Sequence, residues 1–402
     1  MQEEIGCRCL IRRWRLQAGC AAWTGAVCGL DSGVFATAVS LVGEKTGWAD
    51  LAISTFAGIG FFGTFLATIF GGKLADGIGR KRLILFGLAL YFFGALGLVA
   101  GAAVPALLFA GRLLSGAGLG FLYLATPLYL AEMAAVKSRG RRVGLFQFLL
   151  VVGILLGAVC VLGCHQAWIC FALPGLLSAW LAFLLVWLPE DDHAGSRRMA
   201  RVPMSALLKS RGIWLALAVG ALVPLSGIGP VLDYSVTLFK RAGLNGLGAN
   251  GVDVLIKGVN LAMTFPALFL ADRIGRRTLM IAGSLVMTIA LAVTSFSFWS
   301  GGAVGALLAA FGCVIYIAAF AIGPGVCMWL VIPESLSADV RAMGMSVALL
   351  VDYAAVTVII TGFLPFTTAF GLAGGFALLA FFSAALFSAS VFWLKETKGK
   401  EL

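Results

Sequence analysis

The chain has 402 residues, of which 61% are hydrophobic and only 12% are charged. Soluble domains carry about 25% charged residues, so this composition excludes a soluble protein. The formal net charge of +11 would suit a nucleic-acid partner, but the basic residues gather in short segments between long apolar ones, which indicates membrane topology and no nucleic acid.

Long apolar segments recur along the whole chain. About 20 consecutive apolar residues are enough for a helix to cross the hydrocarbon core of a bilayer. The sequence offers twelve segments near that length, so we predict an all-α membrane protein with twelve transmembrane helices. In chain order they cover residues 17–42, 51–72, 83–104, 106–130, 143–164, 167–188, 212–239, 251–271, 278–299, 303–331, 342–366 and 370–394.

The basic residues are distributed unevenly between the two sides of these segments. If both termini are cytoplasmic, most of the Lys and Arg residues fall in the tails and in the loops after even-numbered segments. The outer loops then hold few, chiefly Lys45, Lys240, Arg241 and Lys257. Inner loops rich in Lys and Arg are the rule for membrane proteins. We therefore predict a multi-pass protein of an inner or plasma membrane with both termini in the cytoplasm.

The longest polar interruption predicts the domain organisation. It covers residues 189–211 and separates six apolar segments from six. We expect an N-terminal six-helix bundle over residues 1–188, a cytoplasmic linker over 189–211, and a C-terminal six-helix bundle with a short tail over 212–402. Two repeats of this kind commonly move against each other around a central site, as transporters do.

Charged landmarks support this division because they recur in register in both halves. Asp76 in the second-to-third loop recurs as Asp272, and Glu132 recurs as Glu334 at a nearly constant offset. An arginine follows each of these glutamates at the same distance, at Arg139 and Arg341.

Motifs of enzymes and cofactor sites are missing from the sequence. There is no Walker loop, the nine cysteines show no metal-ligand spacing, and the two histidines, His165 and His193, lie near segment ends. We expect neither catalysis, nor a metal, nor a cofactor.

Two charged residues fall inside predicted membrane segments of the N-terminal half. Asp31 lies near the middle of the first, where a carboxylate is costly unless it is paired, solvated or protonated. Arg112 enters the fourth segment from the outer side and reaches a similar depth. Low dielectric favours the neutral acid, whereas an adjacent guanidinium favours the carboxylate. A change in their separation would therefore change proton affinity; the alternative is a static ion pair joining two helices.

Several motifs occur in the order found in one family of transporters, and they cover nearly the whole chain. With them the sequence resembles the sugar porter family of the major facilitator superfamily. The motifs are Gly29 to Val34, Gly71 to Arg82, Gly111-Arg112, Gly116 to Gly120, Pro127 to Glu132, Arg139-Gly140, Gln147, Leu225 to Ile228, Asn260, Gly323 to Gly325, Trp329, Glu334 and Glu396 to Gly399.

The resemblance implies a major facilitator fold and proton-coupled symport of a small polyhydroxylated solute, a sugar or a polyol, by alternating access. It implies that Asp31 and Arg112 couple the proton. Solute-binding candidates are Gln147, Asn260, Trp329, Asp233, Asp352, Tyr353 and Tyr234. A cytoplasmic gating network would comprise Asp76, Arg80, Glu132, Arg139, Arg141, Glu190, Asp272, Arg276, Glu334, Arg341 and Glu396.

Departures from the family pattern leave two other functions open. Val223-Pro224 replaces two glutamines and Gly229 replaces an asparagine, amides that bind sugar hydroxyls in the family. Asp233 replaces a tyrosine, and Asp352-Tyr353 replaces an Asn-Trp pair. Asp233 and Asp352 would suit an organic cation expelled by proton antiport. A transporter-like receptor without turnover is the third possibility. We expect a small solute, protons and the lipid bilayer as partners, no nucleic acid, and function as a monomer.

Overall fold

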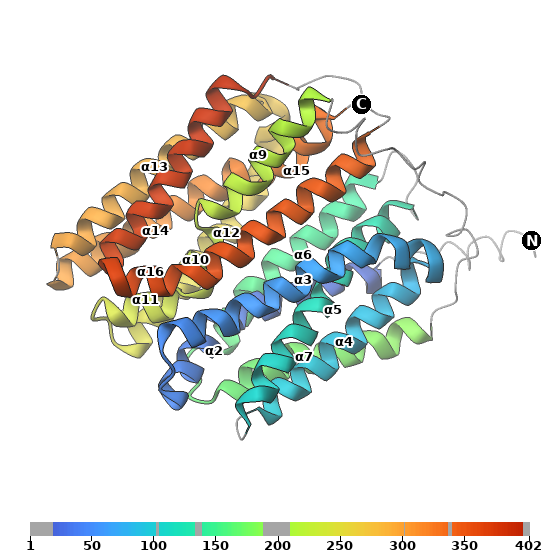
Figure 1. Ribbon diagram of the computed structural model, residues 1–402, viewed down its shortest axis with the longest axis horizontal. Coiled ribbons are helices and arrows are strands. Elements are labelled where there is room, and N and C mark those ends of the chain that lie inside the picture. Colours follow the sequence, from blue (N-terminus) through green and yellow to red (C-terminus); the bar gives the residue numbers. More distant parts are fainter. Residues whose placement is uncertain are drawn as a thin grey trace, which may run out of the picture. The chain divides into compact units, whose positions relative to one another are not determined.

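The computed structural model describes residues 19–101, 104–132, 139–187, 210–300, 302–336 and 340–396. These residues form helices and no strands (Figure 1). The helices are α2 (Thr24–Thr46), α3 (Asp50–Ile78), α4 (Arg80–Ala100), α5 (Pro105–Glu132), α6 (Arg139–Cys160), α7 (Ala167–Val186), α9 (Arg211–Leu225), α10 (Ile228–Asp233), α11 (Ser235–Arg241), α12 (Gly246–Ile274), α13 (Arg276–Ser300), α14 (Gly302–Ile322), α15 (Pro324–Ser335) and α16 (Arg341–Phe392).

The described helices account for the predicted membrane crossings. Nine stretches are long and apolar enough to cross a membrane, and Gly144–Cys160 of α6 is a shorter apolar helix. One stretch, in α16, serves two crossings. This helix of 52 residues would be about 78 Å long at 1.5 Å per residue. It turns back at Gly371, where φ is 75°, and Figure 1 shows its two arms. With α12, which carries buried charges, the crossings reach the twelve predicted.

Two predicted segments are broken in the structure. The segment over 212–239 consists of α9, α10 and α11, because Gly227 adopts a φ of 106° and Tyr234 leaves helical geometry. The segment over 303–331 breaks at Gly323 between α14 and α15. Broken helices in transporters expose backbone groups within the membrane, where side chains and ligands satisfy them.

The chain divides into two compact units. Unit 1 comprises Met1–Ala38 and Ile59–Arg198, and unit 2 comprises Val39–Gly58 and Met199–Leu402. The core of unit 1 includes Leu88 and Leu122, and the core of unit 2 includes Met280 and Val331. The division into two bundles and a linker at 189–211 stays a prediction, since residues 188–209 lie outside the described part.

The same backbone conformation recurs at one glycine in each unit. Gly79 joins α3 to α4 with φ 91° and ψ 153°, and Gly275 joins α12 to α13 with φ 102° and ψ 151°. Both sit in the charged loop motif that recurs in the sequence. Only glycine adopts this region readily, so the motif needs a glycine at this point in each half.

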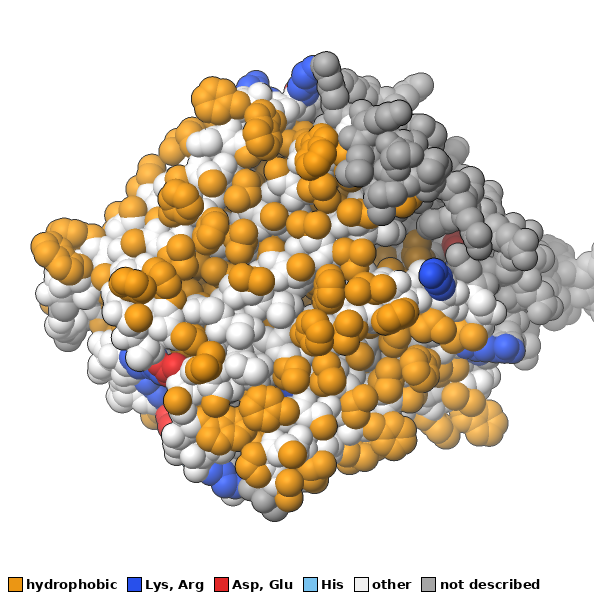
Figure 2. All heavy atoms as spheres, viewed as in Figure 1, with side chains coloured by type: hydrophobic (Ala, Val, Ile, Leu, Met, Phe, Trp, Pro, Cys, Tyr) orange, Lys and Arg blue, Asp and Glu red, His pale blue; other side chains and the backbone are white. Residues whose placement is uncertain are grey.

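Hydrophobic side chains cover much of the face drawn in Figure 2, over the lengths of the helices, while charged side chains are few. Large side chains such as Trp187, Phe296 and Trp299 are more than half exposed. In water such a surface would drive association, whereas in a bilayer it meets the acyl chains.

Candidate proton and solute site

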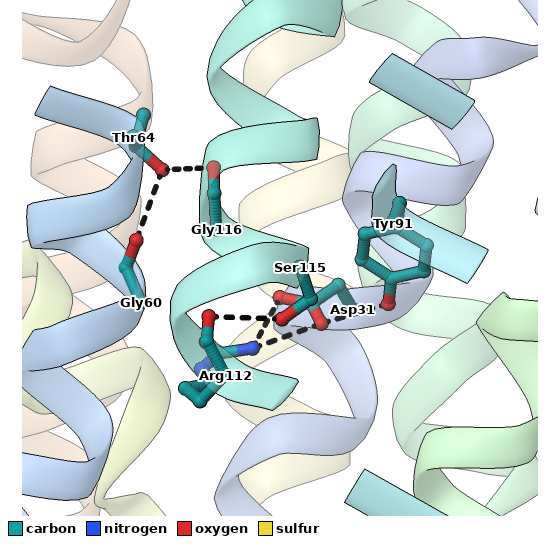
Figure 3. A network of polar contacts seen from close by, with 7 residues as sticks. All are labelled: Asp31, Gly60, Thr64, Tyr91, Arg112, Ser115 and Gly116. Carbon is teal, nitrogen blue, oxygen red and sulfur yellow. Dashed lines mark hydrogen bonds and ion pairs between the residues drawn. The ribbon is translucent and has the colours of Figure 1, made fainter. Parts of the chain in front are cut away.

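Asp31 of α2 lies inside unit 1 with its carboxylate fully occupied by two partners. Arg112 Nη1, from α5, donates to both carboxylate oxygens at 3.0 and 3.1 Å. The hydroxyl of Tyr91, from α4, donates to Oδ1 at 2.8 Å. All three residues are less than 5% exposed, and Figure 3 shows them converging from three helices. A buried carboxylate needs such a set of donors to remain charged.

The guanidinium of Arg112 is held on its other faces as well. Its Cζ atom lies 3.8 Å from the centroid of the Phe35 ring, so an aromatic face supports the cation. A Cβ added at Gly60 of α3 would sit 2.6 Å from Arg112 Nε. The absence of a side chain at Gly60 is therefore what admits the arginine between α3 and α5. Phe35 of α2 thus packs against the Arg112 guanidinium.

Glycines in the same motif bring α2 close to its neighbour α6. A Cβ added at Gly29 would lie 2.0 Å from the Leu150 carbonyl oxygen, and one at Gly33 would lie 2.3 Å from the Ile154 carbonyl oxygen. Small residues allow membrane helices to approach to backbone contact. Asp31 stands between these two glycines, so the packing of α2 fixes its depth and rotation.

Tyr91 is a site residue that the sequence motifs do not indicate. It stands within an apolar run of Leu, Phe and Gly, and it is 1% exposed. The available signal was a lone hydroxyl in a segment that otherwise offers no hydrogen-bonding side chain. Buried tyrosines usually have a partner for that hydroxyl.

In unit 2, Asp233 and Tyr234 lie at the break between α10 and α11. Asp233 is 4% exposed and ends α10. The hydroxyl of Tyr234 donates to the Ile360 carbonyl oxygen at 2.9 Å, and its ring lies nearly parallel to that of Phe363. Tyr234 thus joins the start of α11 to α16, and its hydroxyl is already hydrogen-bonded to the backbone.

The other solute-binding candidates differ in burial. Asn260 on α12 is buried, and Trp329 on α15 is 49% exposed. Gln147 on α6 and the neighbours Asp352 and Tyr353 on α16 are half-buried. Between them, these five residues offer two amides, a carboxylate, a phenol and the face of an indole ring. Their assembly into one solute site stays a prediction.

The charge distribution along the sequence predicts that Lys257 lies in an outer loop, and this prediction is wrong. Lys257 lies within α12 and is fully buried. Its Nζ atom is 2.8 Å from Oδ2 of Asp253, one turn earlier on the same helix. The misplacement arose because a lysine near a segment end was assumed to reach water. The pair Asp253–Lys257 was not singled out.

The inner-face candidates whose side chains are described form pairs within their own unit. In unit 1, Arg80 Nε lies 3.1 Å from Glu132 Oε1. In unit 2, Arg276 Nε lies 3.4 Å from Glu334 Oε1. The Glu396 carboxylate accepts hydrogen bonds from the backbone N–H groups of Arg276 and Arg277, at the start of α13.

The remaining inner-face candidates lie outside the described part. For Glu190 this holds for the whole residue, and for five others it holds for the side chain. These five are Asp76, Arg139, Arg141, Asp272 and Arg341. Among the residues that are described, no group of three or more His, Cys, Asp or Glu could hold a metal ion.

Solved structures show the same fold. A crystal structure of a D-xylose-proton symporter matches 96% of this chain and 99% of its own, with a TM-score of 0.82 and 20% identity. An inward-open structure of the xylose transporter XylE from E. coli covers 95% of this chain and 97% of its own, with a TM-score of 0.82 and 18% identity. The chain therefore has the all-α, twelve-helix major facilitator fold of these structures.

The family follows from the sequence. The family described as "Sugar (and other) transporter" matches residues 18–192 and again 191–402, and the chain belongs to it. Probable polyol transporter 6 of Arabidopsis thaliana is 26% identical, over 98% of this chain and 93% of the relative. H(+)/hexose cotransporter 2 of Parachlorella kessleri is 29% identical, over 87% of this chain and 74% of the relative. These proteins are transporters, not enzymes.

Proposed function

We propose that this chain imports a small polyhydroxylated solute, a sugar or a polyol, together with protons. The observation that carries the proposal is the carboxylate of Asp31, buried in unit 1 and held by Arg112 and Tyr91. The relatives add the solute class, since their names include a polyol transporter and an H(+)/hexose cotransporter.

Asp31 acts as the proton carrier in this proposal. The guanidinium of Arg112 and the hydroxyl of Tyr91 favour the charged carboxylate, whereas burial favours the neutral acid. A proton that binds Asp31 weakens the contact with Arg112, because the ion pair becomes a hydrogen bond between a charged guanidinium and a neutral acid. The contacts of α2 with α4 and α5 therefore depend on the proton. This dependence lets proton binding bias one conformation over another.

The solute contacts are proposed to come from the half-buried and polar candidates. Trp329 offers a flat face on which a sugar ring can stack, and the amides of Gln147 and Asn260 can bind hydroxyl groups. The carboxylates of Asp233 and Asp352 accept hydrogen bonds from hydroxyls. Tyr234 and Tyr353 complete the set. Tyr234 contributes mainly its ring, because its hydroxyl is bonded to Ile360.

The pairs Arg80–Glu132 and Arg276–Glu334 are proposed to lie at the cytoplasmic ends of the helices, with both chain termini on that side. The excess of Lys and Arg in the corresponding loops supports this orientation. An exposed ion pair contributes about 0.2–1 kcal/mol, so a single pair of this kind has little effect. The side chains of Arg80 and Glu132 are 8% and 42% exposed and those of Arg276 and Glu334 are 13% and 11% exposed; the pairs are proposed to act on the conformational equilibrium as a network. The protein is proposed to work as a monomer in an inner or plasma membrane.

Proteoliposomes test the proposal. Purified protein is reconstituted, and D-xylose, D-glucose, myo-inositol and mannitol are added outside while a pH electrode follows the weakly buffered medium. Symport predicts that at least one of these solutes makes the medium more alkaline as it enters. Asp31→Asn should lose this pH change while keeping exchange of labelled solute. Ser388→Ala serves as a control, since Ser388 is exposed and bonds only within its own helix.

The same assay separates the two competing functions. Acidification of the medium while a cation such as tetraphenylphosphonium or a polyamine enters would indicate antiport and contradict the proposal. Absence of counterflow with every solute that binds would indicate a receptor. Unchanged proton movement in Asp31→Asn would remove Asp31 from the mechanism.

A further inference from the structure

Asp352 stands deep in the first arm of α16, the helix that turns back at Gly371. At 1.5 Å per residue it lies about 17 Å from the start of the helix and about 29 Å from the turn. The stretch Met343–Phe392 is long and apolar enough to cross a membrane. Asp352 is therefore a carboxyl group at membrane depth, where a charge is costly.

Asp352 lies on the side of α16 that packs within unit 2. Ala348, Ile359 and Phe363 share this side, because they stand close to whole helical turns away from Asp352, and each is at most 5% exposed. Val358, by contrast, is 67% exposed. At 100° per residue, its position is about 120° away from that of Asp352 around the helix. Asp352 is thus on the protein side of α16 and not on the side open to acyl chains.

Helices α9 and α10 hold the turns of α16 before and after Asp352 (Figure 1). A Cβ added at Gly220 of α9 would lie 2.9 Å from the Ala348 carbonyl oxygen. A Cβ added at Gly229 of α10 would lie 2.9 Å from Ile360 Cδ1. Ala348 and Ile360 are fully buried, whereas Asp352 between them is half-buried. The carboxyl group is therefore less covered than the turns on either side of it, which leaves it accessible to a small molecule.

The carboxyl group of Asp352 makes no hydrogen bond and no ion pair within the part of the chain that the structure describes. The carboxylate of Asp31, by contrast, accepts from both Arg112 and Tyr91. Donors of this kind favour the charged form of an acid, whereas a low-dielectric site without them favours the neutral form. The two acids thus stand in opposite environments.

Neither α9 nor α10 brings a described cation to the level of Asp352. Arg211, whose side chain lies outside the described part, begins α9 and is about 14 Å along that helix from Gly220, at 1.5 Å per residue. Helix α10 ends in Asp233, which is an acid as well. Tyr353, the next residue of α16, carries a phenol, which is uncharged near neutral pH.

The cations at the start of α13 are engaged elsewhere. Arg276 pairs with Glu334 of α15. Arg277 donates from Nη2 to the Val391 carbonyl oxygen, on the second arm of α16. The buried Cys327 of α15 is a thiol, which adds no positive charge.

Further along α16, the hydroxyl of Thr368 donates a short hydrogen bond to Asp50 of α3. The same carboxylate accepts from Arg241 Nη1 at 3.0 Å. This cation is therefore bound to an acid of its own. The described helices that pack against α16 thus leave Asp352 without a positive charge beside it.

An isolated charge at this depth is costly, and an acid avoids the cost by keeping its proton. From the position and the isolation of Asp352 we infer that it is a neutral carboxylic acid at neutral pH and that it binds the solute as both hydrogen-bond donor and hydrogen-bond acceptor. A protonated carboxyl group has one O–H donor and keeps an acceptor oxygen. A side-chain amide, which the sugar porter pattern has at this position, offers the same two functions. The role toward the solute rests on the proposed function.

This state of Asp352 sets a preference among solutes and a direction of pH dependence. The neutral acid suits an uncharged sugar or polyol, whose hydroxyl groups donate and accept in turn. When the acid ionises as the pH rises, its O–H donor is lost, and a charge must then be desolvated as the solute binds. Binding of an uncharged solute should therefore weaken at alkaline pH.

Infrared spectroscopy of the purified full chain tests the protonated acid without any solute. The carbonyl stretch of a carboxylic acid is separate from that of a carboxylate, and its area counts protonated acids. At neutral pH, Asp352→Asn should remove one acid from the wild-type band. Asp31→Asn is the matched control, since Asp31 is charged beside Arg112 and its removal should leave the band unchanged. Equal band areas in Asp352→Asn and in the wild type would overturn the inference. Size-exclusion chromatography checks that both variants are folded, and Asp352→Ala repeats the test in a second variant.

Solute binding tests the second half of the inference. The affinities for D-xylose, D-glucose, myo-inositol and mannitol are measured by thermal shift at neutral and at alkaline pH. The wild type should bind about tenfold more weakly at alkaline pH, the effect of one lost hydrogen bond. Asp352→Asn should keep the same affinity at both, because an amide does not ionise. An equal loss in the wild type and in Asp352→Asn would remove Asp352 from the solute site. Absence of binding by all four solutes would contradict the proposed function, whereas the infrared band would still decide the state of Asp352.

Discussion

The hydroxyl of Tyr91 and the guanidinium of Arg112 meet on the same oxygen of Asp31, at 2.8 and 3.0 Å respectively. The phenol therefore adds a neutral donor to a carboxylate that already has a charged one. Two donors on one oxygen favour the charged carboxylate more strongly than the ion pair alone. In the proposed symport, this arrangement sets how readily Asp31 accepts a proton.

Tyr91→Phe should shift the pH dependence of transport. The substitution removes one hydrogen bond to the charged carboxylate, worth about 1.5 kcal/mol. Because the charged form loses this support, Asp31 becomes easier to protonate, and uptake should persist to higher pH. The measurement is initial uptake against external pH in proteoliposomes. Tyr316→Phe removes a buried hydrogen bond of unit 2 and should leave the midpoint where it was; a shift of the same size there would contradict the assignment.

Arg112→Met should separate exchange from accumulation. Without the guanidinium, burial keeps Asp31 protonated, so the proton no longer cycles and uphill uptake fails while counterflow of labelled solute continues. Loss of one partner of a buried ion pair also destabilises a protein by about 3–5 kcal/mol. Arg112→Lys keeps a charge but not the fork of donors, so it should give an intermediate accumulation ratio. Full accumulation by Arg112→Met would show that the pair is only a structural link.

Gly29→Ala should destabilise the contact between α2 and α6. The added Cβ would lie 2.0 Å from the Leu150 carbonyl oxygen, which is backbone and cannot yield without moving a helix. Overpacking of this kind costs about 1–3 kcal/mol or more. The melting temperature, followed by intrinsic fluorescence in detergent, should fall. Gly144→Ala on α6 is the matched control, since a Cβ there meets nothing within 4 Å. It should leave the melting temperature unchanged or raise it.

Glu396→Ala should loosen the first turn of α13. The carboxylate accepts from the backbone N–H groups of Arg276 and Arg277 at 3.1 and 3.2 Å, groups that have no partner within the helix. Loss of such a cap typically costs about 0.5–2 kcal/mol. Hydrogen exchange at the start of α13 should accelerate. The neighbouring exposed Lys395→Ala should not affect it, and similar exchange in both variants would refute the capping role.

The membrane segments and the family could be predicted from the sequence because both rest on local signals. Apolar runs of sufficient length predict crossings whatever packs around them, and the loop motif around Gly79 and Gly275 is a contiguous string. Breaks inside a segment are harder to predict. Nothing in the hydropathy of residues 212–239 distinguishes one helix from three, since the break depends on the backbone angle of Gly227.

The pairing of charges depended on tertiary structure. Depth along a helix suggested that Asp31 and Arg112 could meet, but the rotation of each helix decides whether they do. That rotation comes from glycines that bring the backbones of α2, α3, α5 and α6 together. The same reason explains why Tyr91 was missed and why Lys257 was placed in water instead of beside Asp253.

The sequence by itself determined that this chain spans a bilayer, that its charged motifs recur in two halves, and that it is a member of a sugar transporter family. These properties follow from composition and from contiguous motifs. The tertiary structure alone decided which buried charges face one another. Two partners, one from α4 and one from α5, hold the carboxylate of Asp31 on α2, and residues of α11 and α12 share the carboxylate of Asp253, because helix packing fixes directions that a linear pattern leaves open.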